Sequence, residues 1–388
     1  MKTTRITEEN LHYFWENSLG VELQTINGTP IRIKFPGTKN YDGPDFVNAI
    51  LEIGGNIIKG DVEIHTKSSL WMQHGHSFNF KYSKVVLHIV WESDGGDMRL
   101  ITGFLPHIVE LSRYVDKVLV LELNKNKNKN KNKNKNQTSR FPCITDTTST
   151  EEMKQVINSE IDKSFRVRLK RKVEIFKHRL MYYNGDIEQT FYSVLCESLG
   201  YAKNKQSFFV LSNEKPFSFL TKLSVEDIIR ELFREDFMFS KSGRPSNYPE
   251  KRLVSLAYLI EKFREIGFYN PIISMYKEKA DVEKWIDIFS VKYLGKERII
   301  TLIANAVLPF IYTVFNDDES GVIKYFSGFP PEPHNKITRI MNKNLFSHLG
   351  IRDDNLIKRQ GAIELYQSRC SIFMCKVCPI SKKICSPQ

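Results

Sequence analysis

A strict two-residue repeat, NKNKNKNKNKNKN at residues 124–136, divides the chain into two parts with different sequence patterns. The repeat has no apolar side chain to bury, so we expect residues 121–147 to form a disordered, solvated loop. Before it, short β-rich runs are separated by Gly and Asn turns, whereas the pattern after it is helical. The repeat therefore predicts two differently folded parts.

The repeat also supplies half of the chain's excess positive charge. The 57 lysines and arginines exceed the 45 acidic residues by 12, and six of these lysines lie in the repeat, which leaves about +6. This balance permits a nucleic-acid partner without requiring one. The N-terminus lacks the apolar core of a signal peptide, and Asn305 and Pro309 interrupt the longest apolar run. We therefore expect a cytoplasmic protein that does not enter a membrane.

The patterns predict an α+β fold for residues 1–120, a helical domain for residues 148–365 and a cysteine-rich tail for residues 366–388. Asn27-Gly28 and Gly54-Gly55-Asn56 indicate hairpin turns. The first part should contain a helix at 8–18, hairpins at 22–35 and 45–67, and a buried strand at 85–92. The second part should contain one long helix or two from about residue 148 to Asn184-Gly185, followed by helices at 186–200, 224–234, 249–266 and 297–315.

Residues 60–67, GDVEIHTK, place four polar groups at alternate positions of a predicted strand. Alternate residues of a strand point to the same face. This face is therefore either a solvated sheet surface or the edge of a metal-dependent active site. The four residues are Asp61, Glu63, His65 and Lys67.

The register of the hairpin decides whether Asp45 joins that face. A three-residue loop would place Asp45 opposite His65 and on the face of Glu63. A two-residue turn would point Asp45 to the other face unless a β-bulge, for example at Gly60, restores the register. The sequence leaves both possibilities open.

If Asp45 and Glu63 converge, with Asp61 as a further ligand, their carboxylates suit Mg²⁺ or Mn²⁺. Lys67 or His65 would then orient a water molecule or stabilise developing charge at a phosphodiester. The predicted catalytic residues are therefore Asp45, Glu63, His65 and Lys67.

Two segments, GPDF at residues 43–46 and VEIHTK at residues 62–67, resemble the core of the PD-(D/E)XK nuclease superfamily. Pro44-Asp45 matches the PD element and Glu63 matches the acidic residue. His65 stands at the lysine position, and Lys67 follows two residues later on the same face. The resemblance implies a metal-dependent nuclease fold and a nucleic-acid partner, for which we favour DNA over RNA.

Most of the chain also resembles an uncharacterised bacterial family of unknown function. This resemblance implies no particular activity. It lies in the stretches NYDGPDFVNA, GDVEIHTKSSLWMQHGH, VVLHIVWE, GRPSNYPEKR and QGAIELYQSRCSIFMCKVCPI.

The segment SSLWMQHGHS, directly after the charged strand, supplies further candidates for nucleic-acid binding. Trp71 would either stack on a base or cap the sheet as a core residue. His74 and His76 would add metal ligands, contact phosphate or remain as exposed loop residues. His88 alternates with Val86 and Val90, so we expect a hydrogen-bonded core histidine there.

A basic helix is predicted at FRVRLKRKVEIFKHR, where seven cations are interrupted by apolar residues. Arg168 and Arg171 on this helix are candidates for phosphate contacts. A charged, solvated helix face is the alternative explanation.

The tail has the spacing C-x4-C-x2-C-x6-C, which predicts a metal centre. Four thiolates this close suit Zn²⁺ or a [4Fe–4S] cluster, and four filled positions indicate a structural role. The tail resembles the iron–sulfur loop of endonuclease-III-type DNA glycosylases, with different spacings, and iron–sulfur centres also occur in some PD-(D/E)XK exonucleases. The ligands would be Cys370, Cys375, Cys378 and Cys385.

Together these patterns favour a metal-dependent nuclease-like protein. One alternative is a nucleic-acid-binding protein that keeps the nuclease fold but does not cleave. Another is a metal-stabilised scaffold or partner-binding protein in which the charged strand is only a polar face.

Overall fold

The structure, a computed structural model, describes residues 6–40, 42–96, 98–116, 150–234, 239 and 248–385, apart from the side chains of residues 201–203, 344, 348, 384 and 385. The predicted disordered loop at 121–147 therefore lies outside the described residues. The chain forms two compact units. The first comprises Met1–Ile161, Ile340–Ile351 and Ile363–Gln388, and the second comprises Asp162–Arg339 and Arg352–Ala362.

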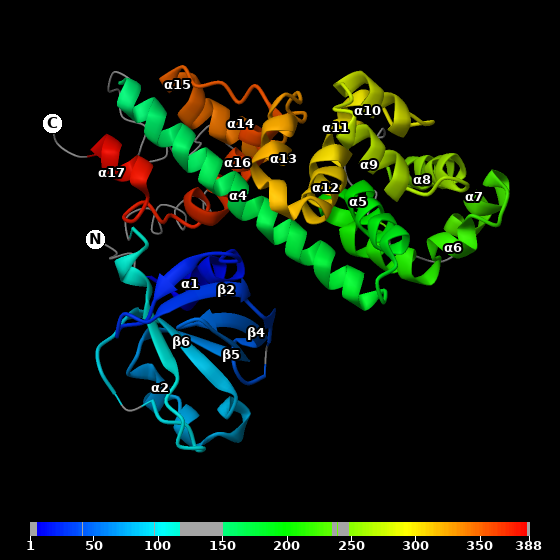
Figure 1. The fold of residues 1–388 in the computed structure, drawn as a ribbon. Coiled ribbons are helices and arrows are strands. Elements are labelled where there is room, and N and C mark those ends of the chain that lie inside the picture. The colour runs from blue at the N-terminus through cyan, green and yellow to red at the C-terminus, as the bar shows by residue number, and fades with distance from the viewer. Residues whose placement is uncertain are drawn as a thin grey trace, which may run out of the picture. The chain divides into compact units, whose positions relative to one another are not determined.

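The predicted α+β class is confirmed, because the first unit contains a seven-stranded mixed sheet and the second consists of helices (Figure 1). The sheet has the order β1-β2-β4-β5-β6-β7, and β3 pairs with β4. The strands are β1 (Glu22–Gln24), β2 (Pro30–Phe35), β3 (Thr38–Lys39), β4 (Phe46–Ile53), β5 (Asn56–Lys67), β6 (Val85–Glu92) and β7 (His107–Glu110).

The predicted helix at the start of the chain is α1 (Glu8–Glu16), and its apolar side is buried as expected. Leu11, Phe14 and Trp15 join the core that the sheet residues form. Burying this side removes apolar surface from water, which is the main driving force for packing the helix.

Strand directions change within the sheet. Both predicted hairpins are present, since β1 pairs with β2 and β4 with β5 in antiparallel orientation. β5, β6 and β7 then run parallel to one another. A parallel pair needs a crossover connection, and residues 68–84 provide it between β5 and β6. This connection contains α2 (Leu70–Gln73) and the short 3₁₀ helices η1 (His76–Phe78) and η2 (Phe80–Tyr82).

The C-terminal segment belongs to the same compact unit as the sheet. Ile372 and Met374 are buried in the sheet's core cluster. Lys376 Nζ donates a hydrogen bond to the Ser112 carbonyl at 3.1 Å. The last helix, α17, spans Pro379–Cys385.

The second unit packs its helices around one large apolar core. Its elements are α5 (Ile187–Glu214), α6 (Phe217–Leu220), α7 (Val225–Phe233), α8 (Pro249–Phe263), α9 (Tyr269–Lys277), α10 (Val282–Phe289), α11 (Lys296–Leu302), η5 (Ile303–Val307), α12 (Leu308–Val314), η6 (Asn316–Asp318) and α13 (Glu319–Ser327). Three further helices have residues in both units: α4 (Glu151–Tyr182), α14 (Lys336–Met341) and α16 (Leu356–Leu365). The shorter elements η3 (Leu111–Arg113), η7 (Asn342–Phe346), α15 (Ser347–Leu349) and η8 (Tyr366–Cys370) belong to the first unit.

By length and composition, the continuous helix Lys296–Val314 would be able to cross a membrane. Its most apolar window is 67% buried within the fold, however, which is typical of a core helix.

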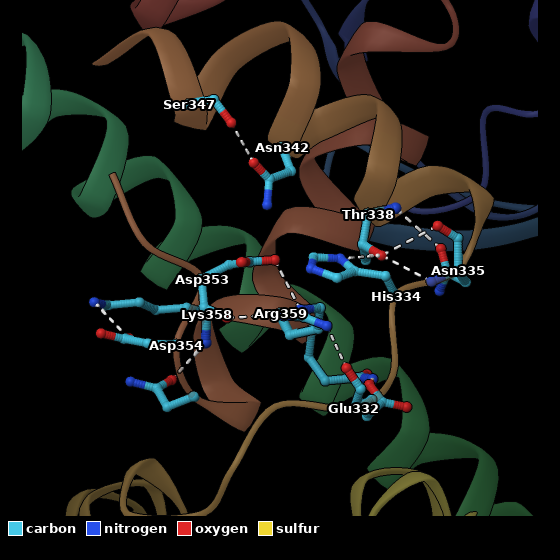
Figure 2. Close-up of polar contacts among 12 residues, drawn as sticks. Glu332, His334, Asn335, Thr338, Asn342, Ser347, Asp353, Asp354, Lys358 and Arg359 are labelled. Atoms are coloured by element: carbon cyan, nitrogen blue, oxygen red, sulfur yellow. Dashed lines mark hydrogen bonds and ion pairs between the residues drawn. The ribbon is translucent and has the colours of Figure 1, made fainter. Parts of the chain in front are cut away.

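A buried polar network lies in the second unit around Arg359 (Figure 2). Arg359 Nε is 2.7 Å from Asp353 Oδ2, and its Nη atoms donate to the carbonyls of Glu332 and Asp353. The Gln360 amide donates to the Glu332 carboxylate. Each buried charge therefore has an oppositely charged or hydrogen-bonding partner, as burial requires.

Candidate metal centre

The β4–β5 hairpin resolves the register that the sequence leaves open. Its turn has two residues, because Ile53 pairs with Asn56. The register then shifts by one residue between Phe46 and Ala49, so that Phe46 lies opposite Val62. The bulge therefore lies in β4 at Val47 and Asn48, not at Gly60.

Two features fix the bulge in place. Asn48 adopts a left-handed backbone conformation with φ 58°, which asparagine tolerates better than most residues. Asp61 Oδ1 accepts a hydrogen bond from the Asn48 backbone N–H at 3.0 Å. Asp61 thus holds the bulge that sets the register of the strand pair.

The bulge brings Asp45 onto the face of Glu63. Glu63 Oε2 accepts a hydrogen bond from the Asp45 backbone N–H at 3.0 Å. Asp45 Oδ2 accepts one from the Ile64 backbone N–H at 2.9 Å. Asp45 Oδ1 lies 3.2 Å from His12 Nε2 on α1. Helix and hairpin therefore both position this carboxylate pair.

Glu63 is 5% exposed and has unusual electrostatics. Burial, together with the adjacent Asp45 carboxylate, raises the pKa of Glu63 to about 9. In the part of the chain that the structure describes, no lysine or arginine lies in salt-bridge contact with Asp45 or Glu63. The pair therefore holds a proton at neutral pH when no cation is bound.

Three histidines converge beside Glu63. His65 Nε2 on β5 lies 3.1 Å from His74 Nδ1 and 3.3 Å from His76 Nε2. Glu63 Oε1 lies 3.2 Å from His76 Nε2 and 3.5 Å from His65 Nε2. His65, His74 and His76 are the only group of three potential metal ligands found among the described residues, with their donor atoms all within 4.8 Å of one another.

Burial and packing restrict the histidine rings. His65 is 2% exposed, and burial together with four other histidines, first of all His88, lowers its pKa to about 2. Burial also lowers the pKa of His76. The Tyr82 ring stacks on His76 with a centroid distance of 3.9 Å. His74 is exposed, so this side of the cluster meets solvent.

His88 is the hydrogen-bonded core histidine that the sequence predicts. It is fully buried, and burial lowers its pKa to about 3. Its Nε2 lies 2.8 Å from His65 Nδ1, and its Nδ1 lies 3.0 Å from the Met98 sulfur.

The other candidates near the strand, Lys67 and Trp71, have interaction partners outside the carboxylate pair. Lys67 is 54% exposed along its side chain and lies 3.4 Å from Asp94. Hydrogen bonds, first of all from the Ser69 backbone, lower the pKa of Asp94 to about 2. Trp71 is fully buried, and its Nε1–H donates to Ser77 Oγ at 3.0 Å. Its ring is therefore covered by protein, which agrees with the alternative that Trp71 is a core residue and not a platform for a base.

The two basic-helix candidates belong to the second unit. Arg168 Nε donates to Gln360 Oε1 at 2.6 Å and is partly buried. Arg171 is also partly exposed on α4. Their proposed contacts with phosphate remain predictions.

The four-cysteine centre also remains a prediction, because the Cys385 side chain lies outside the described residues. Cys370 and Cys375 are partly exposed, Cys378 is buried, and none of the three forms a disulfide.

Sequence reasoning did not identify His12 as a neighbour of Asp45, nor the histidines as one cluster. His12 lies on a helix far from the hairpin in sequence, and no local pattern links the two. The spacing H-x8-H-x-H from His65 to His76 was the available signal for the cluster.

Residues 8–233 match the model of the family described as Protein of unknown function (DUF2851). The chain belongs to this family. No curated protein and no solved structure matches the chain. The stretch that matches DUF2851 contains the carboxylate pair and the histidine cluster.

Proposed function

We propose that this DUF2851 protein is a metal-dependent nuclease-like protein that acts on phosphodiester bonds of nucleic acid. The observation that carries the proposal is the convergence of Asp45 and Glu63 across the bulged hairpin. This is the arrangement that the PD-(D/E)XK resemblance requires. On opposite faces of the sheet, the two carboxylates would not have been able to share an ion.

The residues fit a divalent cation. Two neighbouring carboxylates, one of them buried, lack a lysine or arginine partner in the described part of the chain, and Glu63 keeps a proton instead. Their hard oxygen atoms suit Mg²⁺ or Mn²⁺. A bound divalent cation would polarise a phosphodiester and promote ionisation of water.

The surrounding residues position the carboxylates and the substrate. The Ile64 N–H donates to Oδ2 of Asp45, and His12 Nε2 lies 3.2 Å from its Oδ1. A substrate phosphate would approach from the exposed side of the histidine cluster, at His74. Lys67, at the end of β5, would supply positive charge to that phosphate after exchanging its contact with Asp94.

One observation favours the non-catalytic alternative. A buried, neutral His65 occupies the lysine position of the nuclease pattern, and Lys67 is engaged by Asp94. A protein with this arrangement would bind nucleic acid through its basic surfaces without cleaving it.

The test is incubation of the purified full-length protein with end-labelled single- and double-stranded DNA and RNA, in Mg²⁺ or Mn²⁺. We expect cleavage by the wild type, and a loss of at least about 100-fold in Asp45→Asn, since metal-assisted steps depend on such ligands. Asp42→Asn is the matched control, because Asp42 is three residues away and 81% exposed along its side chain. Binding without cleavage by all three proteins would support the non-catalytic alternative, and neither binding nor cleavage would contradict both.

A further inference from the structure

We propose that Glu63, His65, His74 and His76 form a Zn²⁺ site. Ligand atoms held 2.0–2.1 Å from a tetrahedral ion lie about 3.3–3.4 Å apart. His65 Nε2 lies 3.1, 3.3 and 3.5 Å from the donor atoms of His74, His76 and Glu63, and His76 Nε2 lies 3.2 Å from Glu63 Oε1. The donor atoms of the three histidines all lie within 4.8 Å of one another. The three histidines are therefore placed to bind one ion, and Glu63 Oε1, which is close to His65 and His76, is the proposed fourth ligand.

The hydrogen bonds of His88 select the metal-binding tautomer of His65. The Met98 sulfur has no hydrogen to donate, so His88 Nδ1 must carry the proton in their 3.0 Å contact. His88 is fully buried, and its hydrogen-bonding side-chain contacts in the described structure are Met98 and His65, so it stays neutral.

His88 Nε2 is then an acceptor, and His65 Nδ1 must donate to it. His65 Nε2 therefore presents a lone pair to His74, His76 and Glu63. A histidine that binds a metal through one nitrogen commonly donates its other N–H to a fixed partner in this way.

Neighbouring rings hold the site in shape while leaving it accessible. Tyr82 stacks on His76, and Trp71 packs edge-on against the same ring with a centroid distance of 5.3 Å. His74 is exposed, which gives an ion a route from solvent. The cluster is thus packed against aromatic rings at His76 and exposed to solvent at His74.

The donor chemistry separates this site from the proposed Mg²⁺ or Mn²⁺ position. Imidazole nitrogens favour Zn²⁺ and similar ions, whereas Mg²⁺ prefers oxygen ligands. Glu63 turns Oε1 toward the histidines and Oε2 toward Asp45. Zn²⁺ binding does not require nuclease activity, so a protein that binds Zn²⁺ here and cleaves nothing would support this site while opposing the proposed function.

The experiment is a Zn²⁺ titration of the chelator-treated, reduced full-length protein in competition with a chromophoric chelator. His74→Ala is the informative variant, because an exposed side chain is removed without opening the core. We expect it to bind one tight equivalent of Zn²⁺ fewer than the wild type. His178→Ala, at an exposed histidine on α4 in the second unit, is the matched control and should bind as the wild type does.

Co²⁺ distinguishes this site from the predicted cysteine centre. The wild-type spectrum minus that of His74→Ala should show visible cobalt bands without the near-ultraviolet bands of thiolate ligation.

Met98→Leu keeps all four ligands and nearly the same volume but removes the acceptor for His88. We expect it to lower Zn²⁺ affinity by about 10–100-fold. Equal Zn²⁺ binding by wild type and His74→Ala, or thiolate bands in the difference spectrum, would overturn the proposal.

Discussion

Two buried polar regions of this protein differ in how their charges are balanced. In the helical unit, Arg359 pairs with the Asp353 carboxylate and donates to the Glu332 backbone carbonyl, so the buried cation has a buried anion beside it (Figure 2). On the sheet, Glu63 lies beside Asp45, His65 and His76, and no arginine or lysine reaches it within the described residues. The first region contains a cationic side chain that balances its buried acid, whereas the second does not.

This difference separates a structural network from a candidate functional site. Burying an acid without a cationic partner costs stability, so such an arrangement persists where function requires it. We expect mutations in the Arg359 network to change stability alone. Mutations around Glu63 should also change the response to pH and to metal ions.

The largest effect is expected from Arg359→Met. Removing this buried cation leaves the Asp353 carboxylate without its ionic partner and the Glu332 carbonyl without its donor, which should lower the free energy of unfolding by about 3–5 kcal/mol. Urea denaturation measures the change. Lys358→Met is the matched control, since the side chains of the neighbouring Lys358–Asp354 pair are 33% and 55% exposed and the pair should contribute less than about 0.5 kcal/mol. Similar losses in both variants would show that Arg359 is not a buried structural charge.

The next effect is a pH dependence caused by Glu63. Its folded-state pKa is raised from 4.5 to about 9, so between these values the folded protein keeps a proton that the unfolded chain has lost. Stability therefore falls as pH rises, by about 2 kcal/mol between pH 7 and 8.5. Urea denaturation with EDTA should show this fall in the wild type.

Glu63→Gln should abolish the fall, because an amide does not titrate. Glu52→Gln on the adjacent strand is the control. Contact with Lys34 lowers the pKa of Glu52, so Glu52 stays ionised throughout this range and the variant should keep the wild-type slope. If the free energy of unfolding of Glu63→Gln fell with pH as steeply as that of the wild type, Glu63 would not be the buried acid that keeps a proton.

A smaller effect is expected from Asp61→Ala. It removes the hydrogen bond that Asp61 accepts from the Asn48 N–H at the bulge, at a cost of about 1–2 kcal/mol. If this bond maintains the register, the variant should also bind metal less tightly, although its direct ligands are unchanged. Thermal unfolding with and without metal would measure both effects. Unchanged metal affinity would show that the bulge survives without Asp61.

The smallest effect on stability is expected from Lys67→Met. The Lys67–Asp94 pair is exposed on the lysine side, so its loss should cost less than about 1 kcal/mol. If Lys67 serves the proposed nuclease reaction, cleavage should fall sharply while the urea midpoint barely moves. Unchanged cleavage in Lys67→Met would exclude a catalytic role for this lysine.

The sequence predicted much of the fold because the deciding signals are local. Gly28 in the first hairpin turn and Gly54-Gly55 in the second adopt the left-handed backbone conformations that these turns require. The β-branched run at residues 85–92 forms β6, and the apolar side of α1 is buried as its spacing predicts. These patterns depend on neighbours along the chain, so composition and period suffice to recognise them.

The sequence also identified Asp45, Glu63, His65, His74 and His76 as candidates, but it did not determine which of them meet. One extra residue at Val47–Asn48 decides the face to which Asp45 points, since side-chain direction alternates with each step along a strand. His12 and His88 reach the cluster from other elements. Only tertiary structure decided the site, because contacts between distant segments depend on register and packing rather than on local preference.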